Sequence, residues 1–183
     1  MISSRSTGVL VLLAGLGLAA SAPAQQAPAA PAPAPPVADT QVVKLEAVHV
    51  VVLPMKGSYM QHPDAFARLG GYLAGRGVTP SGPAIGCYYS DPSVGEANLV
   101  WEIAFPVAAG VTVEAPFEVK DLPATQAAVH VHKGPMEEIG TAWGNLVQWA
   151  MSNGYMPGMP AMQVFKGDMS ATGEVELRLP VTK

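Results

Sequence analysis

The sequence predicts an α+β domain that contains a β-α-β-β unit twice, related by a pseudo-twofold axis, with antiparallel sheets and helices packed on one side. The first observation is an internal repeat, because residues 56–91 align without a gap with residues 133–168 at an offset of 77 positions. The second is that each copy carries a helical apolar pattern flanked by strand patterns. The repeat pairs residue types that rarely match by chance: Gly57 with Gly134, Phe66 with Trp143, Tyr72 with Trp149, Pro80 with Pro157, Pro83 with Pro160 and Tyr88 with Phe165.

The first unit covers about residues 42–107 and is expected to open with one long strand. Residues 42–53 are rich in valine at alternating positions, which is typical of a strand. A helix should start at residues 62–64, because proline suits the first helical turn and an acid favours the positive end of the helix dipole. Glycines end this helix near residue 77. Two further strands are predicted at 83–90 and 99–107, joined by a turn at 91–95.

The second unit covers about residues 125–181 and repeats this order. Residues 125–132 alternate apolar and polar side chains, which indicates a strand with one buried face. A helix is expected after Pro135, with its acidic residues at the positive end of the dipole and its end at AsnGlyTyr, residues 153–155. The last two strands are predicted at 160–166 and 174–179.

The N-terminal segment has the pattern of an export signal. Arg5 precedes an apolar run at residues 8–19, and the small residues Ala22 and Ala24 predict cleavage after Ala24. Residues 1–24 are therefore expected to be a signal peptide, and an uncleaved anchor is the alternative. Residues 25–41 form a Pro/Ala-rich stretch that predicts a disordered linker. We expect a periplasmic or secreted protein with no stable membrane insertion after cleavage.

Composition excludes some partners. The chain has 10 Lys and Arg residues against 14 Asp and Glu, for a formal charge of −4, and the basic residues form no stripe. Nucleic acid is therefore not an expected partner. The single cysteine, Cys87, lies among apolar residues and is interpreted as a buried structural residue, with a catalytic thiol as the alternative.

The second helix and its surroundings carry a family resemblance. Residues 134–149 read GPMEEIGTAWGNLVQW, and AsnGlyTyr, a strand led by proline and a closing ELRLPV follow. This combination resembles the GyrI-like small-molecule-binding domain, which includes effector-binding domains of AraC-type and MerR-type transcription activators. The resemblance implies that residues 42–183 form such a domain, with a ligand cleft between the two halves. Its members bind lipophilic and often cationic molecules, and a few hydrolyse small alkylating compounds.

The resemblance also implies a set of ligand-binding residues. These are the aromatic, methionine and amide side chains at cleft-strand and helix positions: Tyr59, Tyr88, Trp143, Trp149, Tyr155, Met162, Gln163 and Phe165. Gln163 stands where the family commonly has a cleft glutamate, and Gly86 is its counterpart in the first unit. An amide neither selects a cation nor acts as a general base. A non-enzymatic, exported domain that binds a lipophilic or aromatic molecule is therefore expected, without catalytic residues, cofactor or metal. A hydrolase of this family acting on small xenobiotics is the alternative.

Three further residue sets could carry chemistry. His130 and His132 share a strand face, so they are interpreted as solvated residues, with a metal site completed by His49 or His62 as the alternative. Met156, Met159 and Met162 are spaced by three and offer thioethers to Cu(I), although a loop that enters the cleft strand also explains them. A periplasmic copper or zinc protein is thus a third functional class. After a three-residue slip the repeat resumes, and residues 101–107 align with residues 175–181 at an offset of 74 positions. Glu102 and Glu176 are therefore equivalent and are interpreted as sheet-face residues rather than a catalytic pair.

Overall fold

A computed structural model describes residues 39–166 and 174–183. The predicted signal peptide, residues 1–24, and most of the predicted linker, residues 25–41, lie outside the described residues. The two helices are α1 (His62–Gly75) and α2 (Ile139–Ser152), preceded by the short 3-10 segments η1 (Tyr59–Gln61) and η4 (Met136–Glu138). The strands are β1 (Gln41–Leu45), β2 (Val48–Lys56), β3 (Ile85–Tyr88), β4 (Val100–Pro106), β5 (Glu118–Leu122), β6 (Thr125–Lys133), β7 (Met156–Pro157), β8 (Ala161–Lys166) and β9 (Glu174–Thr182).

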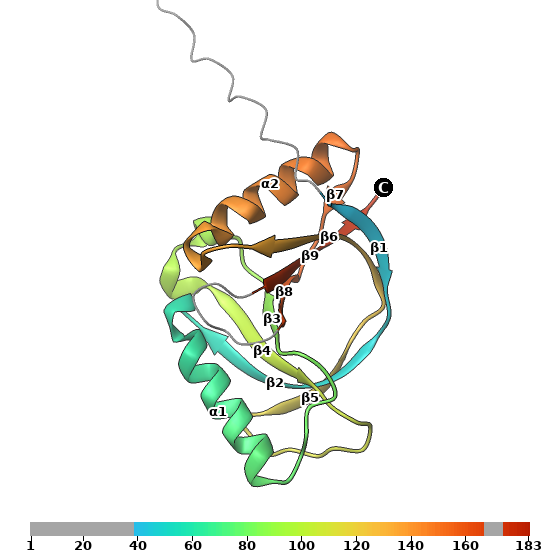
Figure 1. The fold of residues 1–183 in the computed structure, drawn as a ribbon. Helices are drawn as coiled ribbons and strands as arrows, with labels where there is room; N and C mark the ends of the chain where they lie inside the picture. The colour runs from blue at the N-terminus through green and yellow to red at the C-terminus, as the bar shows by residue number, and fades with distance from the viewer. Residues whose placement is uncertain (1–38, 167–173) are drawn as a thin grey trace, which may run out of the picture. The chain divides into compact units, whose positions relative to one another are not determined.

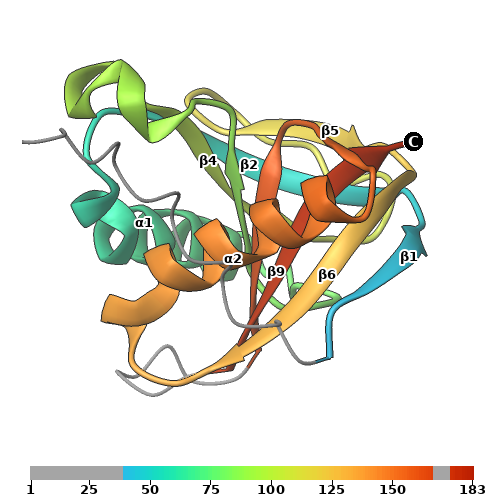
Figure 2. The same ribbon diagram turned by 90° about the horizontal axis from the view of Figure 1, so that it is seen from above.

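The strands form one antiparallel sheet in the order β1-β6-β9-β8-β3-β4-β2-β5, and β7 pairs with the end of β9. The sheet curls, so that β1 closes part of a ring between β6 and β2 (Figure 1). Both helices lie against the outer face of the curl (Figure 1, Figure 2). The α+β class, the antiparallel pairing and the helices on one side are therefore confirmed, with a single continuous sheet in place of separate ones. Neither helix described is long and apolar enough to span a membrane.

The offset of 77 residues recurs in the element bounds. It relates Gln41 at the start of β1 to Glu118 at the start of β5, and Val48 of β2 to Thr125 of β6. The helices α1 and α2 obey it as well. At the centre, β3 pairs with β8, and Gly86 lies directly opposite Gln163, its own equivalent. The pseudo-twofold axis therefore passes through this residue pair.

The single strand predicted at residues 42–53 is wrong. Glu46 and Ala47 are exposed and separate β1 from β2. Strand β1 pairs with β6 of the second half, whereas β2 pairs with β4 and β5. The apolar alternation continues through the break, so periodicity alone could not reveal that the chain changes partners. Strand β5 is the symmetry equivalent of β1 and was not predicted.

The helices form where the sequence places apolar residues on one face. Helix α1 buries Ala65, Phe66, Leu69 and Leu73, and α2 buries Ala142, Leu146 and Ala150. Both pack on one core cluster that includes Val51, Trp101, Ile103 and Leu177. Each helix is followed by a glycine with positive φ, Gly77 and Gly154, a conformation that costs glycine little. Helix α1 covers β2 and β4 of the first half, and α2 covers β6 and β9 of the second half.

A second, smaller cluster lies on the inner face of the curled sheet. It contains Val50, Val52, Ile85, Cys87, Ala104 and Met162. Cys87 is fully buried there, which confirms the structural interpretation of the lone cysteine. Burial raises the pKa of its thiol to about 12, so the reactive thiolate is not populated at neutral pH.

Candidate functional site

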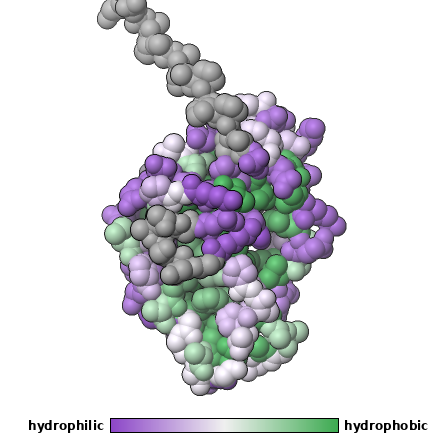
Figure 3. Space-filling view, viewed as in Figure 1, coloured by the Kyte–Doolittle hydropathy of each residue, from purple (hydrophilic) through white to green (hydrophobic). Residues whose placement is uncertain are grey.

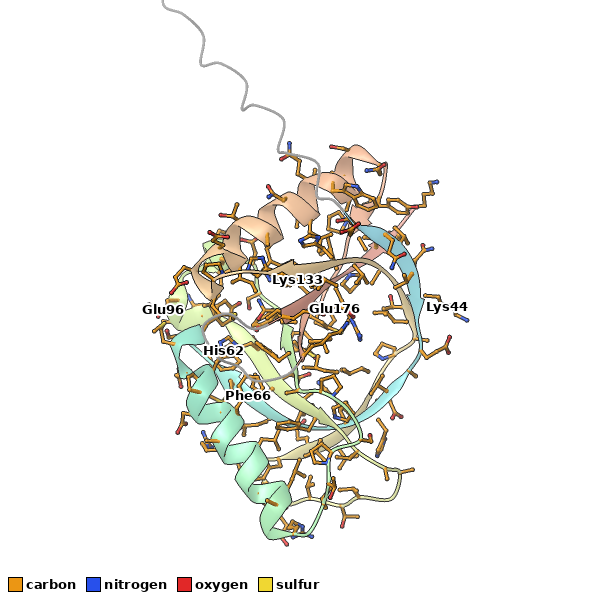
Figure 4. All side chains as sticks on the ribbon, viewed as in Figure 1. Lys44, His62, Phe66, Glu96, Lys133 and Glu176 are labelled. Carbon is orange, nitrogen blue, oxygen red and sulfur yellow. The ribbon has the colours of Figure 1, made fainter. Side chains whose placement is uncertain are left out.

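The two central strands are not covered by the bodies of the helices, and their helix-facing side chains form the candidate site. Tyr88 of β3 and Gln163 and Phe165 of β8 point to this side, and His62 and Phe66 reach it from α1. Figure 4 shows His62 and Phe66 on the side of α1 that faces the sheet. We call these five residues the central site.

A short hydrogen-bond chain runs through the central site. The Tyr88 hydroxyl donates to Gln163 Oε1 over 2.8 Å, and the same hydroxyl oxygen lies 3.1 Å from His62 Nε2. The role of His62 Nε2 in this contact depends on the tautomer, because a neutral imidazole has one N–H group. The chain His62–Tyr88–Gln163 therefore links α1 to both central strands.

Gly86 makes room for this chain. A Cβ atom at position 86 would lie 2.6 Å from the Tyr88 hydroxyl oxygen and 3.0 Å from its Cζ. The tyrosine ring thus folds over the bare backbone of Gly86 to reach Gln163 on the opposite strand. The pseudo-twofold axis is occupied by an amide on one side and by a glycine on the other.

Aromatic rings surround the chain. Tyr59 packs edge-on against Tyr88 at a centroid distance of 5.1 Å, and Trp101 lies 4.4 Å from the His62 ring. Phe66 meets Phe165 edge-on at 5.1 Å, which joins α1 to the second half of the molecule. The surroundings of the Gln163 amide are therefore apolar and aromatic.

This environment keeps the central site uncharged. Burial lowers the pKa of His62 to about 4, partly opposed by a backbone hydrogen bond to Tyr59. Burial also holds the pKa of Tyr88 well above its ordinary value. At neutral pH both side chains are neutral, and Gln163 carries no charge at any pH.

The floor of the central site is closed in this structure. Phe66, Tyr88, Gln163 and Phe165 are 7%, 8%, 7% and 9% exposed. Only small parts of these four side chains are therefore open to solvent.

The structure brings together four of the predicted ligand-binding residues: Tyr59, Tyr88, Gln163 and Phe165. Trp143 lies in α2 at the position equivalent to Phe66 and packs, partly buried, on the same core. The structure places three other predicted residues apart. Met162 belongs to the cluster on the opposite face of the sheet. Trp149 and Tyr155 stack on each other at 6.5 Å, with Lys183 over the Tyr155 ring.

Sequence reasoning missed His62, Phe66 and Trp101 as parts of this site. The sequence around His62 predicted the start of a helix, and His62 itself was considered only as an alternative metal ligand. The repeat contained a signal for Phe66, because its equivalent Trp143 is among the predicted residues. Trp101 has Val175 as its counterpart, so the repeat gave no indication of its role.

The two equivalent glutamates lie on the other face of the sheet. Glu102 is 5% exposed, bonds to the Tyr89 hydroxyl and pairs with Lys120. Glu176 pairs with Lys166 and with Arg178. Burial alone would raise the pKa of Glu176, but the hydrogen bonds from Lys166 and Arg178 lower it below its ordinary value. These contacts fit the interpretation of both glutamates as sheet-face residues.

Glu176 lies inside the curl of the sheet, away from His62 and Phe66 (Figure 4). In the space-filling view, hydrophilic residues gather near the middle of the face turned to the viewer (Figure 3). The inner face of the sheet therefore combines an apolar cluster with buried ion pairs, whereas the helix-facing side holds the aromatic central site.

The interpretation of His130 and His132 as solvated residues is wrong for His132. His132 is 7% exposed, and its Nε2 lies 3.1 Å from the carbonyl oxygen of Pro135. Both histidines line a cavity of about 380 Å³, here called the flank cavity, together with Glu138, Thr141, Ala142 and Asn145. Thr141 and Trp143 flank the buried Ala142 on opposite sides of α2, so the flank cavity lies on the side of the helix opposite to Trp143.

The described residues offer little support for a metal site. They contain no group of three or more His, Cys, Asp or Glu side chains arranged to hold a metal ion. Of the three spaced methionines, Met156 and Met159 are exposed, whereas Met162 is buried in the inner-face cluster.

Comparisons with known proteins agree with this architecture. The GyrI-like small molecule binding domain family matches residues 38–182. Among solved structures, the C-terminal domain of EcmrR is similar with a TM-score of 0.71 and 20% identity, over 79% of this chain and 97% of that domain. The full EcmrR chain in its complex with DNA gives 0.70 and 19%, over 79% of this chain, and this chain spans 57% of its length.

Two further structures share the fold. A hydrolase from Listeria innocua has a TM-score of 0.58 and 13% identity, over 81% of this chain and 94% of that one. SAV2435 bound to tetraphenylphosphonium has a TM-score of 0.53 and 13% identity, over 79% and 94%. No curated protein matches the chain significantly. At these identities the solved structures show the fold alone.

Proposed function

The chain belongs to the GyrI-like small-molecule-binding domain family, and on that premise we propose that it binds a lipophilic, uncharged molecule at the central site. The observation that carries the proposal is the Gln163 amide on the pseudo-twofold axis, enclosed by aromatic rings and with no charged group in its hydrogen-bond chain. Apolar rings with few polar groups are the usual lining of a small-molecule site. SAV2435, a relative in fold, is bound to the lipophilic ion tetraphenylphosphonium.

Binding without hydrolysis is the activity we propose. A hydrolytic site needs a group that activates water, most often a histidine or a carboxylate. Burial lowers the pKa of His62 to about 4, which makes its imidazole a weak base. Glu102, which is buried, and Glu176, which is half-buried, lie on the opposite face of the sheet from Gln163 and are held in ion pairs. One relative in fold is a hydrolase, but the amide of Gln163 cannot take the part of a general base.

The charge preference of the site provides the first test. Methyltriphenylphosphonium and 1,1,1-triphenylethane have the same shape and differ in charge. We expect the neutral compound to bind the wild-type protein at least as tightly as the cation. Gln163→Glu should shift the preference toward the cation by about 1–3 kcal/mol, because the second carboxylate oxygen places a charge in an apolar environment. Quenching of tryptophan fluorescence measures both affinities, since Trp101 lies beside His62.

An opposite result would be informative. A wild-type protein that prefers the cation, with a preference that Gln163→Glu leaves unchanged, would mean that another acid faces the ligand. Glu138, which lines the flank cavity, would then be the first residue to replace.

We also propose that the protein acts after export. The positive start at Arg5, the apolar run at residues 8–19 and the small residues Ala22 and Ala24 support a cleaved signal peptide. The Pro/Ala-rich residues 25–41 would then separate the new N-terminus from the folded domain. A lipophilic compound would be bound in the periplasm or outside the cell.

Expression of the full chain in a Gram-negative host tests the export proposal. We expect the periplasmic fraction to contain a protein whose N-terminal sequence begins at Gln25. An arginine in the middle of the apolar run, at Leu12, should block export, since a charge breaks the apolar segment that defines the signal. Recovery of soluble protein with an intact Met1 from the cytoplasm would contradict the proposal.

A further inference from the structure

The orientation of the Gln163 amide determines which kind of ligand group it can bind. Its carbonyl oxygen, Oε1, accepts the hydrogen bond of the Tyr88 hydroxyl over 2.8 Å. Its amide nitrogen, Nε2, has no partner in the described part of the chain. The acceptor half of the amide is thus occupied, and the donor half is not.

The Gln163 nitrogen also keeps access to solvent. Among the described side chains, His49 Nε2 is the one nitrogen or oxygen that is fully buried and lacks a hydrogen-bond partner. The Gln163 Nε2 also lacks a partner, but it is not fully buried. The residue as a whole is 7% exposed.

The neighbouring groups hold the amide in this orientation. The Tyr88 hydroxyl gives its single proton to Gln163 and lies 3.1 Å from His62 Nε2. Rotation of the amide by half a turn would replace this hydrogen bond to Oε1 by a contact between the hydroxyl and the amide N–H₂ group. Gly86 provides the space that keeps the Tyr88 hydroxyl at this position.

From these contacts we infer that Gln163 recognises a hydrogen-bond acceptor on the ligand, such as a carbonyl or phosphoryl oxygen, through its amide N–H groups. This inference rests on the proposed function and narrows the ligand class to lipophilic molecules that carry an exposed acceptor oxygen. Tyr88 acts as a positioning residue, because its hydrogen bond to Oε1 leaves the amide N–H groups for the ligand.

Two ligands of one shape separate this inference from the proposed function. Triphenylphosphine oxide carries a strong acceptor oxygen where 1,1,1-triphenylethane carries a methyl group. We expect triphenylphosphine oxide to bind the wild-type protein about tenfold more tightly, the factor that corresponds to one hydrogen bond made in an apolar site. Gln163→Leu should remove that preference, so that the ratio of the two affinities falls to about one, because leucine has no N–H group to donate.

The positioning role is tested by Tyr88→Phe. The aromatic ring remains, and the measurement is the ratio of the affinities for triphenylphosphine oxide and triphenylethane. The freed amide can turn either half to the ligand, so the preference for triphenylphosphine oxide should fall to about threefold or less. If Tyr88 had a purely structural role, Tyr88→Phe would lower the affinities for both ligands by the same factor. That result would overturn this part of the inference.

The possible outcomes differ clearly. If both compounds bind and the wild-type protein does not distinguish them, the inference about the acceptor is wrong while the proposed function stands. A preference that persists in Gln163→Leu would also overturn it. If neither compound binds in the folded wild-type protein, the proposed function itself fails.

Discussion

Replacement of Lys120 by methionine is expected to destabilise the protein by about 3 kcal/mol, the cost of leaving a buried charge without its partner. Glu102 is 5% exposed and its carboxylate pairs with Lys120, the one cation paired with it among the described residues. Methionine keeps most of the length of the lysine side chain but removes the charge. The Tyr89 hydroxyl would remain bonded to Glu102 and could not neutralise it.

The pseudo-symmetry supplies a matched control for this prediction. Lys166 pairs with Glu176, the equivalent of Glu102, but Glu176 also pairs with Arg178. Lys166→Met should therefore cost about 1 kcal/mol or less, because one cation remains in place. Urea denaturation of the two variants gives the comparison.

A second substitution identifies the cause of the loss. In the Lys120→Met background, Glu102→Gln should restore part of the lost stability, since an amide in this position carries no charge to be buried. Equal losses in Lys120→Met and Lys166→Met would indicate that the lysines matter through packing of their aliphatic stems. The unpaired-charge explanation would then be wrong.

The helices and the central strands could be predicted because their signals are local in the sequence. Pro63 and Asp64 mark the start of α1, and Gly77 and Gly154 follow the ends of both helices with positive φ. The internal repeat relates Gly86 to Gln163 through the sequence alone. The repeat did not show which equivalent residues meet on the twofold axis, and the pairing of β3 with β8 is known from the structure.

The partner exchange of β1 could not be predicted in the same way. Residues 42–53 keep one apolar alternation, and only the two exposed residues Glu46 and Ala47 separate the segment that pairs with β6 from the one that pairs with β4. Hydrophobic periodicity reports which face is buried and not which strand lies alongside. The short strand β5 was missed because its sequence, EVKDL, is mostly polar.

Only part of the site could be predicted from the sequence. Residue type suggested the aromatic lining, but the contacts that assemble it are between residues far apart in the chain. His62 and Gln163 are joined through Tyr88, and Phe66 packs on Phe165 across the two halves. Met162 is next to Gln163 in sequence and therefore faces the opposite side of the sheet.

Replacement of Gly86 by alanine should have the second large effect, a destabilisation of about 1–3 kcal/mol with loss of the acceptor preference. The added methyl would lie 2.6 Å from the Tyr88 hydroxyl oxygen, closer than the two atoms can approach. Tyr88 must then leave its place between His62 and Gln163, which breaks a buried hydrogen-bond chain. Urea denaturation and binding of triphenylphosphine oxide measure the two consequences.

Gly71→Ala is the matched control, because position 71 is exposed in α1 and a methyl there would meet nothing within 4 Å. It should stabilise the protein by up to about 1 kcal/mol through helix propensity. Adding Tyr88→Phe to Gly86→Ala should recover part of the stability, since the atom in closest conflict is the hydroxyl oxygen. A Gly86→Ala protein with wild-type stability and wild-type ligand preference would show that the Tyr88 ring can lie elsewhere without cost, and that the glycine on the pseudo-twofold axis does not control the orientation of Gln163.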